Sequence, residues 1–418
     1  MVCRDEGSAV ISLQEAKDFV LRDLRALEPE EMILEGALGC AVATDVIARE
    51  QVPSFLNSSM DGFTFRAVDT SPGGARLNIV GSILAGRPSP RTLEPGEAMR
   101  IMTGAPLPEG ADTVCRIEDL TIEDDHVVVP HEVAVGACVR VPGDDVRVGQ
   151  VLVTSGSELT PTALAVMAGQ GLSSVWAYRR PVVGVLSTGD ELALTTEALV
   201  PGQIRDLNRP LVLGLVREVG MIGVDLGVVA DDRDEIARRL TDAIARCDVV
   251  ISTGGVSVGD VDHVKGVIGD LAAGRSRSVQ VAIKPAKPFA FGLVGNVPTP
   301  VFGLPGNPVS TRVSFEMFVR PALRTLGGHH LIERPRILAT LDISLPAPVD
   351  GKIHLVHVSA IVGDDGRIHV IDAARHNSHL MSAIVNSNAI AILEPGGSYG
   401  VGEGADVVIV GYDSLARS

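Results

Sequence analysis

The chain has 418 residues, and its 52 acidic against 36 basic side chains give a formal net charge of −16. This balance, without any run of basic residues, argues against a nucleic-acid partner, because phosphate-backbone binding draws on clustered Lys and Arg. The length predicts about two to four domains, and an aromatic content of only 3% predicts cores of small aliphatic side chains in sheets covered by helices.

Cysteine usage and the N-terminal residues indicate the compartment. The five cysteines are scattered without a C-x-x-C pair, which suggests neither a disulfide framework nor a zinc site. Asp5 and Glu6 occupy the place where a signal peptide needs an apolar stretch, and no segment has the length of a membrane span. We therefore expect a cytoplasmic protein with no membrane contact.

The first part of the chain predicts a helix followed by a small β-rich region. Ser12 and Glu15 form a capping box, and apolar residues then recur at helical spacing as far as Leu27. From about Val52 to Pro142, short β-type runs such as LNIVGSIL and HVVVP alternate with Gly/Pro turns. A helix returns at LTPTALAVMAGQG, which has a proline at its first position and glycines at its end.

Beyond residue 180 the pattern alternates between strand and helix. PVVGVLS, VDLGVVA and DVVIS predict buried parallel strands, whereas NRPLVLGLVREVG and RDEIARRLTDAIARC predict the helices between them. After GGHH at 327–330, alternating runs such as ILATLDI and KIHLVHV predict a last β-rich region. The predicted fold class is multidomain α/β plus β, with a doubly wound α/β domain. The predicted domains are 1–50 with 143–180 as a discontinuous helical and extended linking domain that dimerises, 51–142 as a small β-rich domain, 181–327 as the α/β domain, and 328–418 as a C-terminal β domain.

Polar residues follow three of the predicted parallel strands. Ligands of a doubly wound sheet bind beyond the carboxyl ends of its strands, and here these ends carry STGDEL, the pair Asp231-Asp232, and STGGVSVGDVDHVK. Each segment alone reads as a turn or a helix cap, but together they bring glycines, hydroxyls and carboxylates to one edge. The glycines and hydroxyls suit an anion. Neither the dinucleotide fingerprint nor the Walker loop is present.

Two further loops are predicted to join this edge. IKPAKPF holds Lys284 and Lys287 between prolines, which fix the backbone and favour anion binding over two solvated surface lysines. In FGLPGNPVS, Asn307 or Ser310 could cap the helix that follows, and the N-terminus of that helix could face an anion. By composition alone, NSSMDGFTFRAVD and RIMTGAPLPEGADTV read only as polar turns.

Six motifs, in this order, closely resemble those of the molybdopterin molybdotransferase family, the molybdenum insertases that include the C-terminal part of gephyrin. They are SSMDGFTFR, MTGAPLPEGADTV, STGDEL, STGGVSVGDVDHVK, IKPAKPFAFG and GLPGNPVS. The resemblance covers nearly the whole chain and implies an elongated homodimer that hydrolyses adenylylated molybdopterin in the presence of molybdate and Mg²⁺, releasing AMP. The alternatives are the preceding adenylyltransferase, which is also a candidate partner, and a non-catalytic scaffold or binding protein.

The resemblance also implies roles for single residues. Catalytic positions are matched by Asp61, Thr103, Glu191, Asp231 and Asp262, of which Glu191 and Asp262 are the expected metal ligands. The positions around molybdate are matched by Lys284, Lys287, Pro288, Ser310, Ser378 and His357. The strand-end and loop residues expected to bind pterin or phosphate are Thr188, Gly189, Asp190, Thr253, Gly254, Gly255, Ser257, Pro305, Gly306, Asn307 and Pro308.

Two positions depart from the family pattern. His357 stands where family members commonly carry an arginine, and Ala286 stands where glycine is usual. A histidine is only partly charged near neutrality and lacks the guanidinium fork, so we expect weaker molybdate binding. The pairs His354/His357 and His376/His379 have H-x-x-H spacing, but no carboxylate or cysteine ligands accompany them, which favours surface or cleft histidines over a metal site.

Overall fold

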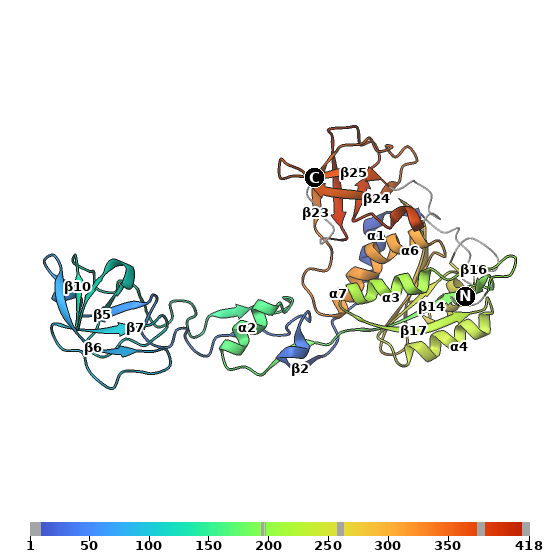
Figure 1. The fold of residues 1–418 in the computed structure, drawn as a ribbon. Helices are drawn as coiled ribbons and strands as arrows, with labels where there is room; N and C mark the ends of the chain where they lie inside the picture. Colours follow the sequence, from blue (N-terminus) through green and yellow to red (C-terminus); the bar gives the residue numbers. More distant parts are fainter. Residues whose placement is uncertain (1–9, 194–195, 197, 257–262, 374–380, 412–418) are drawn as a thin grey trace. The chain divides into compact units, whose positions relative to one another are not determined.

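The structure is a computed structural model that describes residues 10–193, 196, 198–256, 263–373 and 381–411 (Figure 1). The chain divides into two compact units. One consists of Met1–Thr44, Ser155–Thr160 and Ser174–Ser418, and the other of Asp45–Thr154 and Pro161–Ser173.

A seven-stranded sheet forms the centre of the first unit. Its order is β1-β19-β21-β22-β18-β14-β17. Strands β14, β17, β18 and β22 are mutually parallel, whereas β21 runs antiparallel to both of its neighbours. The strands are β1 (Val10–Ile11), β14 (Val182–Thr188), β17 (Ile222–Val229), β18 (Val249–Thr253), β19 (Ser276–Val281), β21 (Pro288–Val294) and β22 (Thr299–Leu304).

Helices cover both faces of this sheet because its strands are apolar on both sides. Val185 packs into a core shared with α1, α3, α6 and α7, whereas Leu186, the next residue, packs into a core shared with α4 and α5. The predicted parallel strands, the helices between them and the fold class are therefore confirmed. The helices are α1 (Leu13–Leu21), α3 (Asn208–Glu218), α4 (Arg233–Ile244), α5 (His263–Leu271), α6 (Pro308–Ser314) and α7 (Arg320–Leu326), with a π-helix, η4 (Phe315–Val319), between the last two.

The N-terminal helix begins as predicted but ends earlier. The Ser12–Glu15 capping box is present. Helix α1 stops at Leu21, and the chain then turns so that the backbone N–H of Leu27 donates to the carbonyl of Leu326 at 2.8 Å. Leu24 and Leu27 therefore reach the same core from outside the helix.

The C-terminal residues form a second sheet that closes on itself. Its order is β20-β24-β25-β23-β27-β26, and an additional β24–β26 pairing closes it. Strand β20, which precedes the α/β strand β21, pairs with β24 and so ties this sheet to the α/β region. The strands are β20 (Ile283–Lys284), β23 (Arg336–Leu341), β24 (Ile353–Val362), β25 (Ile368–Ala373), β26 (Ala389–Leu393) and β27 (Gly404–Ile409).

The second unit contains the predicted β-rich region and the predicted helix α2 (Pro161–Gly169). Its sheet has the order β8-β5-β7-β6-β10-β9 around a core that includes Phe63 and Phe65. The strands are β5 (Gly62–Phe65), β6 (Ala75–Ile83), β7 (Glu97–Ile101), β8 (Thr113–Arg116), β9 (Thr121–Glu123) and β10 (His126–Val129).

Short ladders complete the structure, and two of them belong to the first unit. In one, β2 (Pro29–Ile33) pairs antiparallel with β13 (Ser174–Tyr178), and in the other, β15 (Leu192–Ala193) pairs parallel with β16 (Ile204–Arg205). Strand β1 and helix α1 belong to the α/β region, so residues 1–50 contribute to more than one part of the structure. The boundaries of the four predicted domains stay a prediction. Among the helices of the described ranges, none is long and apolar enough to cross a bilayer.

Candidate functional site

The carboxyl ends of β14, β17 and β18 lie side by side. Thr188 is in register with Val229, and Ser187 with Thr253. The hydroxyl oxygens of Ser187 and Thr253 are 2.9 Å apart, and both side chains are buried. The structure thus brings the predicted strand-end residues together at one edge of the sheet.

Two glycines allow the backbone to pass this edge closely. Gly254 has φ +90°, and a Cβ atom there would lie 2.5 Å from the carbonyl oxygen of Thr188. Gly255 has φ +65°, and its Cβ would lie 2.7 Å from Val264 Cγ2. Any larger residue would therefore have to move the backbone or the neighbouring helix.

Three carboxylates follow the neighbouring strands β14 and β17 at the same edge. The Asp231 backbone N–H donates to Asp190 Oδ1 at 3.0 Å, and a Cβ at Gly189 would lie 2.6 Å from Glu191 Oε2. Burial, followed by the charges of Asp190 and Glu191, raises the pKa of Asp231. Mutual repulsion of this kind is relieved by a cation.

The donor set fits a magnesium ion that is shared with a ligand. In the part of the chain that the structure describes, no three carboxylate, imidazole or thiolate groups converge tightly enough to form a metal cage. Mg²⁺ is usually held by one or two carboxylates together with substrate phosphates, so Asp190, Glu191 and Asp231 suit that mode of binding.

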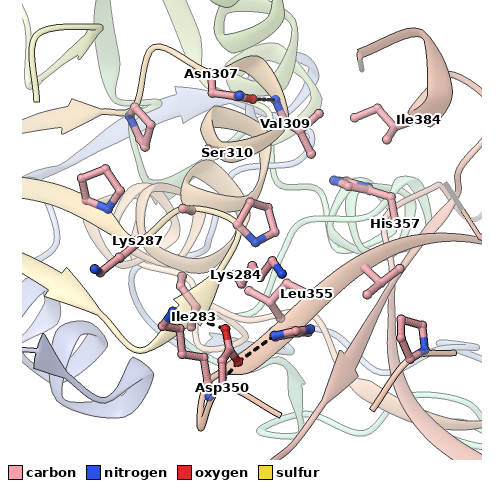
Figure 2. A pocket seen from close by; sticks show the side chains of 18 of the residues that line it. Ile283, Lys284, Lys287, Asn307, Val309, Ser310, Asp350, Leu355, His357 and Ile384 are labelled. Atoms are coloured by element: carbon pink, nitrogen blue, oxygen red, sulfur yellow. Dashed lines mark hydrogen bonds and ion pairs between the residues drawn. The ribbon is translucent and has the colours of Figure 1, made fainter. Parts of the chain in front are cut away.

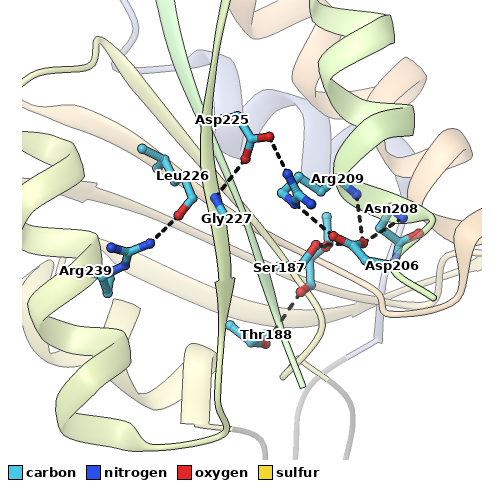
Figure 3. Close-up of polar contacts among 10 residues, drawn as sticks. Ser187, Thr188, Asp206, Asn208, Arg209, Asp225, Leu226, Gly227 and Arg239 are labelled. Atoms are coloured by element: carbon cyan, nitrogen blue, oxygen red, sulfur yellow. Dashed lines mark hydrogen bonds and ion pairs between the residues drawn. The ribbon is translucent and has the colours of Figure 1, made fainter. Parts of the chain in front are cut away.

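A buried polar cluster that was not predicted from the sequence contacts the end of β14 (Figure 3). Asp206 is only 2% exposed and accepts hydrogen bonds from Ser187 Oγ at 3.1 Å and Arg209 Nε at 2.9 Å. Asn208 Nδ2 donates to the Gly306 carbonyl at 2.7 Å. The sequence carries one signal for this cluster, an aspartate just before the start of a helix. Ordinary helix caps show the same pattern, so the signal is not specific.

A cavity of about 970 Å³ lies between the loop after β20, the start of α6 and strand β24 (Figure 2). Its lining brings together most of the residues expected around molybdate and part of the expected phosphate loop. Gly306 joins the cavity to the strand-end site, because a Cβ at Gly306 would lie 3.6 Å from the Gly254 Cα. The expected residues that line it are Lys284, Lys287, Pro288, Ser310 and His357, with Pro305, Gly306 and Asn307.

Helix α6 begins at the cavity wall. Asn307 is its cap, since Asn307 Oδ1 accepts the Val309 N–H at 3.3 Å, whereas Ser310 lies inside the helix. Pro308 is the first helical residue and fixes the entry of the chain. Ala286, in the opposite loop, is buried with φ +74°, a backbone conformation that favours glycine.

Asp350 and Lys352, which line the cavity, were missed from the sequence, and His354, expected as a surface or cleft histidine, joins them there. Asp350 Oδ1 lies 2.9 Å from His354 Nε2, and Asp350 Oδ2 lies 3.3 Å from Lys352 Nζ (Figure 2). These hydrogen bonds, chiefly that of His354, lower the pKa of Asp350 to about 2. The pairing of Lys284 with His354 in the β20–β24 ladder puts this group beside the expected lysine. The contact joins residues far apart in the chain, so local pattern carries no signal for it.

His357 is buried, and its charge state differs from the expected one. The side chain is 4% exposed, and Nε2 has no hydrogen-bond partner among the described residues. Burial, followed by the charge of Arg312, lowers the pKa of His357 to about 3. The expectation of a partly charged imidazole is therefore wrong, because at neutral pH the ring is neutral.

In the second unit, Asp61 and Thr103 are in direct contact. The backbone N–H and the hydroxyl of Thr103 both donate to Asp61 Oδ1 at 2.7 Å, and they lower the pKa of Asp61. Both residues are exposed. The pair is a carboxylate held in one orientation and ready to accept a further hydrogen bond or a cation.

Some expected site residues lie outside the described part of the chain. These are Ser257, Asp262 and Ser378, and the histidine pair His376/His379 lies there too. The roles predicted for the first three stay predictions.

Comparison with known proteins identifies relatives over nearly the whole chain. Residues 11–171 match the model of the MoeA N-terminal region (domain I and II), and residues 184–325 match that of a probable molybdopterin binding domain. The molybdopterin molybdenumtransferase of Haemophilus influenzae is 35% identical and aligns over 92% of this chain and 95% of its own length. That of Bacillus subtilis is 32% identical over 97% of this chain and 95% of its own.

A solved structure supports the same relationship. The crystal structure of the molybdopterin biosynthesis MoeA protein from Pyrococcus horikoshii OT3 is 26% identical to the chain. It covers 96% of this chain and all of its own, with a TM-score of 0.81. The chain thus belongs to the molybdopterin molybdenumtransferase family, a family of transferases in molybdenum-cofactor biosynthesis.

Proposed function

We propose that this chain is a molybdenum insertase, which transfers molybdenum from molybdate to adenylylated molybdopterin and releases AMP. The observation that carries the proposal is the continuity of two sites of opposite charge. The carboxylate-lined strand ends and the lysine-lined cavity adjoin at Gly306. A substrate with a pyrophosphate at one end and a dithiolene at the other can span such a junction.

The cavity suits an oxyanion. Three of the chain's five lysines, Lys284, Lys287 and Lys352, line it. Neither Lys284 nor Lys287 forms an ion pair with a described carboxylate, so both ammonium groups are available to a ligand. Ser310 adds a hydroxyl from α6. Lysines and hydroxyls are the groups that hold a dianion without a metal.

The strand ends suit the pyrophosphate and the pterin. Thr188, Thr253 and the glycines beside them offer hydroxyls and close backbone approach. A magnesium ion held by Glu191 and its neighbours, with Asp262, would neutralise phosphate charge and polarise phosphorus. In the proposed reaction, water cleaves the pyrophosphate bond, and the adenylyl phosphate leaves as AMP. Asp61 and Thr103 are proposed to complete the catalytic set.

The assembly and location are also proposals. We place a homodimer contact at the β2–β13 ladder, because Ile33 and Trp176 on it are 65% and 51% exposed. Four cysteines, at 40, 115, 138 and 247, are free, as is usual in the reducing cytoplasm. The upstream adenylyltransferase is a proposed partner, since it would hand over a reactive substrate. Light scattering of the purified protein tests the dimer.

A reconstituted reaction tests the function. The full chain is incubated with adenylylated molybdopterin, Mg²⁺ and molybdate, and AMP is quantified while cofactor is assayed by activation of an apo-molybdoenzyme. We expect AMP and active cofactor to form together. Absence of both refutes the insertase. Pyrophosphate release from ATP and molybdopterin would instead identify an adenylyltransferase, and tight pterin binding without turnover would identify a scaffold.

A variant pair makes the test specific to the cavity. Lys284→Gln removes one cation from the lining and is expected to raise the molybdate concentration that gives half-maximal cofactor formation. Arg246→Gln removes an exposed charge at the end of α4, outside the cavity, and serves as the matched control. Equal behaviour of the two variants would remove Lys284 from the molybdate site.

A further inference from the structure

The wall of the cavity formed by β24 contains a buried polar atom that has no partner among the residues that the structure describes. His357 lines the cavity, is 4% exposed, and has no hydrogen-bond partner for Nε2 within the described ranges. Figure 2 shows its imidazole directed from β24 toward the start of α6, where Val309 and Ser310 lie. An unpaired buried nitrogen is unfavourable unless a ligand completes it. The geometry therefore indicates that a ligand atom belongs beside His357.

His357 alone cannot hold a dianion, because its ring is neutral. A neutral imidazole has one N–H, and an oxygen ligand in the cavity would select the tautomer with the proton on Nε2. This hydrogen bond would orient the ligand, but the neutral ring adds no positive charge to balance the charge of the anion. At the rim, Asp350 already offsets the charge of Lys352. The His357 wall thus needs positive potential from another residue.

Arg312 lies in position to provide it. It is three residues after Val309 on α6, so it follows a cavity-lining residue on the same helix face. Its charge reaches the imidazole, since it contributes to the lowered pKa of His357. Arg312 is itself partly buried and remains a cation, because a guanidinium keeps its proton in proteins.

The acidic neighbours of Arg312 are engaged elsewhere. Glu218 Oε1 accepts from Arg334 Nη2 at 2.7 Å, and Glu316 Oε1 accepts from Arg334 Nε at 3.0 Å. Glu316 also lies 3.7 Å from Arg320 Nε. No described carboxylate forms an ion pair with Arg312. The positive charge of Arg312 is therefore not cancelled by a direct partner.

We propose that Arg312 is a positioning residue for molybdate that acts through His357: the imidazole donates Nε2–H to a molybdate oxygen, and the guanidinium of Arg312 on α6 stabilises the negative charge. The proposal rests on the proposed function for the identity of the anion. It reverses the expectation that a histidine at 357 weakens molybdate binding. In the proposal this part of the cavity still has a cation, which comes from Arg312 on α6 and not from a residue on β24.

Direct binding of molybdate to the full chain, without pterin, tests the proposal. Calorimetric titration is expected to give a dissociation constant about tenfold higher for Arg312→Met than for the parent chain. Arg312→Lys, which keeps the charge, should retain most of the affinity. The double variant Arg312→Met/His357→Arg, which moves the charge to the cavity wall, should recover it. Arg246→Met is the control for loss of an arginine.

Several outcomes would overturn the proposal. They are an unchanged constant in Arg312→Met, an equal loss in Arg312→Lys, or no recovery in the double variant. If Arg312→Met does not fold, the ¹⁵N resonance of His357 Nε2 in the parent chain decides, and no shift with molybdate counts against the proposal.

The turnover assay separates this proposal from the proposed function. With Arg312→Met, we expect a higher half-saturating molybdate concentration and an unchanged maximal rate of AMP release, which a merely structural role would not produce. Parent chain that binds molybdate as described but releases no AMP would refute the insertase and leave the Arg312–His357 site standing. Turnover with unaltered molybdate dependence in the variant would refute only Arg312.

Discussion

Replacing Gly254 by alanine should destabilise the end of β18 far more than the backbone conformation alone requires. The residue has φ +90°, which costs an L-residue about 1 to 2 kcal/mol. In addition, the new Cβ would lie 2.5 Å from the Thr188 carbonyl oxygen and 3.0 Å from its Oγ1. Forced overpacking of this kind typically costs about 1 to 3 kcal/mol. We therefore expect a total loss of about 3 kcal/mol at this edge.

The chain offers a matched control for the backbone contribution. Gly274 also has φ +90°, but nothing lies within 4 Å of a Cβ placed there. Gly274→Ala should lose only about 1 kcal/mol. The difference between the variants, about 2 kcal/mol, then measures the close approach of Gly254 to Thr188.

Amide hydrogen exchange gives the local measurement, because a chain with several domains does not unfold in one step. Peptides that cover Val249–Thr253 report the opening free energy of β18 in each variant. Gly254→Ala should also lose AMP release, because the substitution displaces the strand-end site beside Thr188. Gly274→Ala should keep AMP release. Equal exchange in the two variants, within about 0.5 kcal/mol, would refute the steric argument.

Three other predictions follow from the charges in the structure. Thr103→Val removes one of two hydrogen bonds to Asp61 and should raise its pKa, so the acid limb of the AMP-release profile should move to higher pH; an unmoved limb contradicts this. His329 is buried beside Arg324, and its pKa is lowered from 6.5 to about 4. The unfolded state therefore takes up the proton first as pH falls below 6.5. Between pH 7 and 4.5 the opening free energy of the segment around His329 should fall by about 2.5 kcal/mol more in the parent than in His329→Gln, as measured by amide hydrogen exchange at each pH. Asp231→Asn relieves carboxylate repulsion, so the melting temperature of the variant without Mg²⁺ should not fall below that of the parent. The rise in melting temperature on adding Mg²⁺ should be smaller in the variant than in the parent. An equal rise in both would count against a cation at Asp231.

Local chemistry predicted the elements, and the fold brought the predicted loops together. The capping box at Ser12 and the cap at Asn307 depend on neighbours within three residues, so they can be read from the sequence. The strand ends meet because parallel strands have their carboxyl ends at one edge. By contrast, the rim group of Asp350, Lys352 and His354 sits beside Lys284 only through a ladder between residues about seventy apart, which no local pattern encodes.

The state of His357 shows the same limit for electrostatics. Its ordinary pKa predicts partial charge. In the structure, burial of the ring lowers this pKa, and so does the charge of Arg312, which is 45 positions earlier in the chain. Residue identity alone therefore indicates a weakened anion site, whereas the structure has a cation, Arg312, on helix α6, which begins at the same cavity. Chemistry that depends on burial has to be read from the structure.

The charge distribution explains why the two sites adjoin without interfering. With a net charge of −16, the chain as a whole repels a dianion, so capture depends on a local excess of cations. Lys284 and Lys287 supply that excess in the cavity, because Asp350 offsets the charge of Lys352. Burial, followed by the charges of Asp190 and Glu191, raises the pKa of Asp231 at the strand-end site, which adjoins the cavity at Gly306. In the proposed reaction, molybdate would be drawn to the lysines, and a phosphate would enter the acidic edge only together with a cation. The proposed function thus puts each anion at its own end of one continuous site.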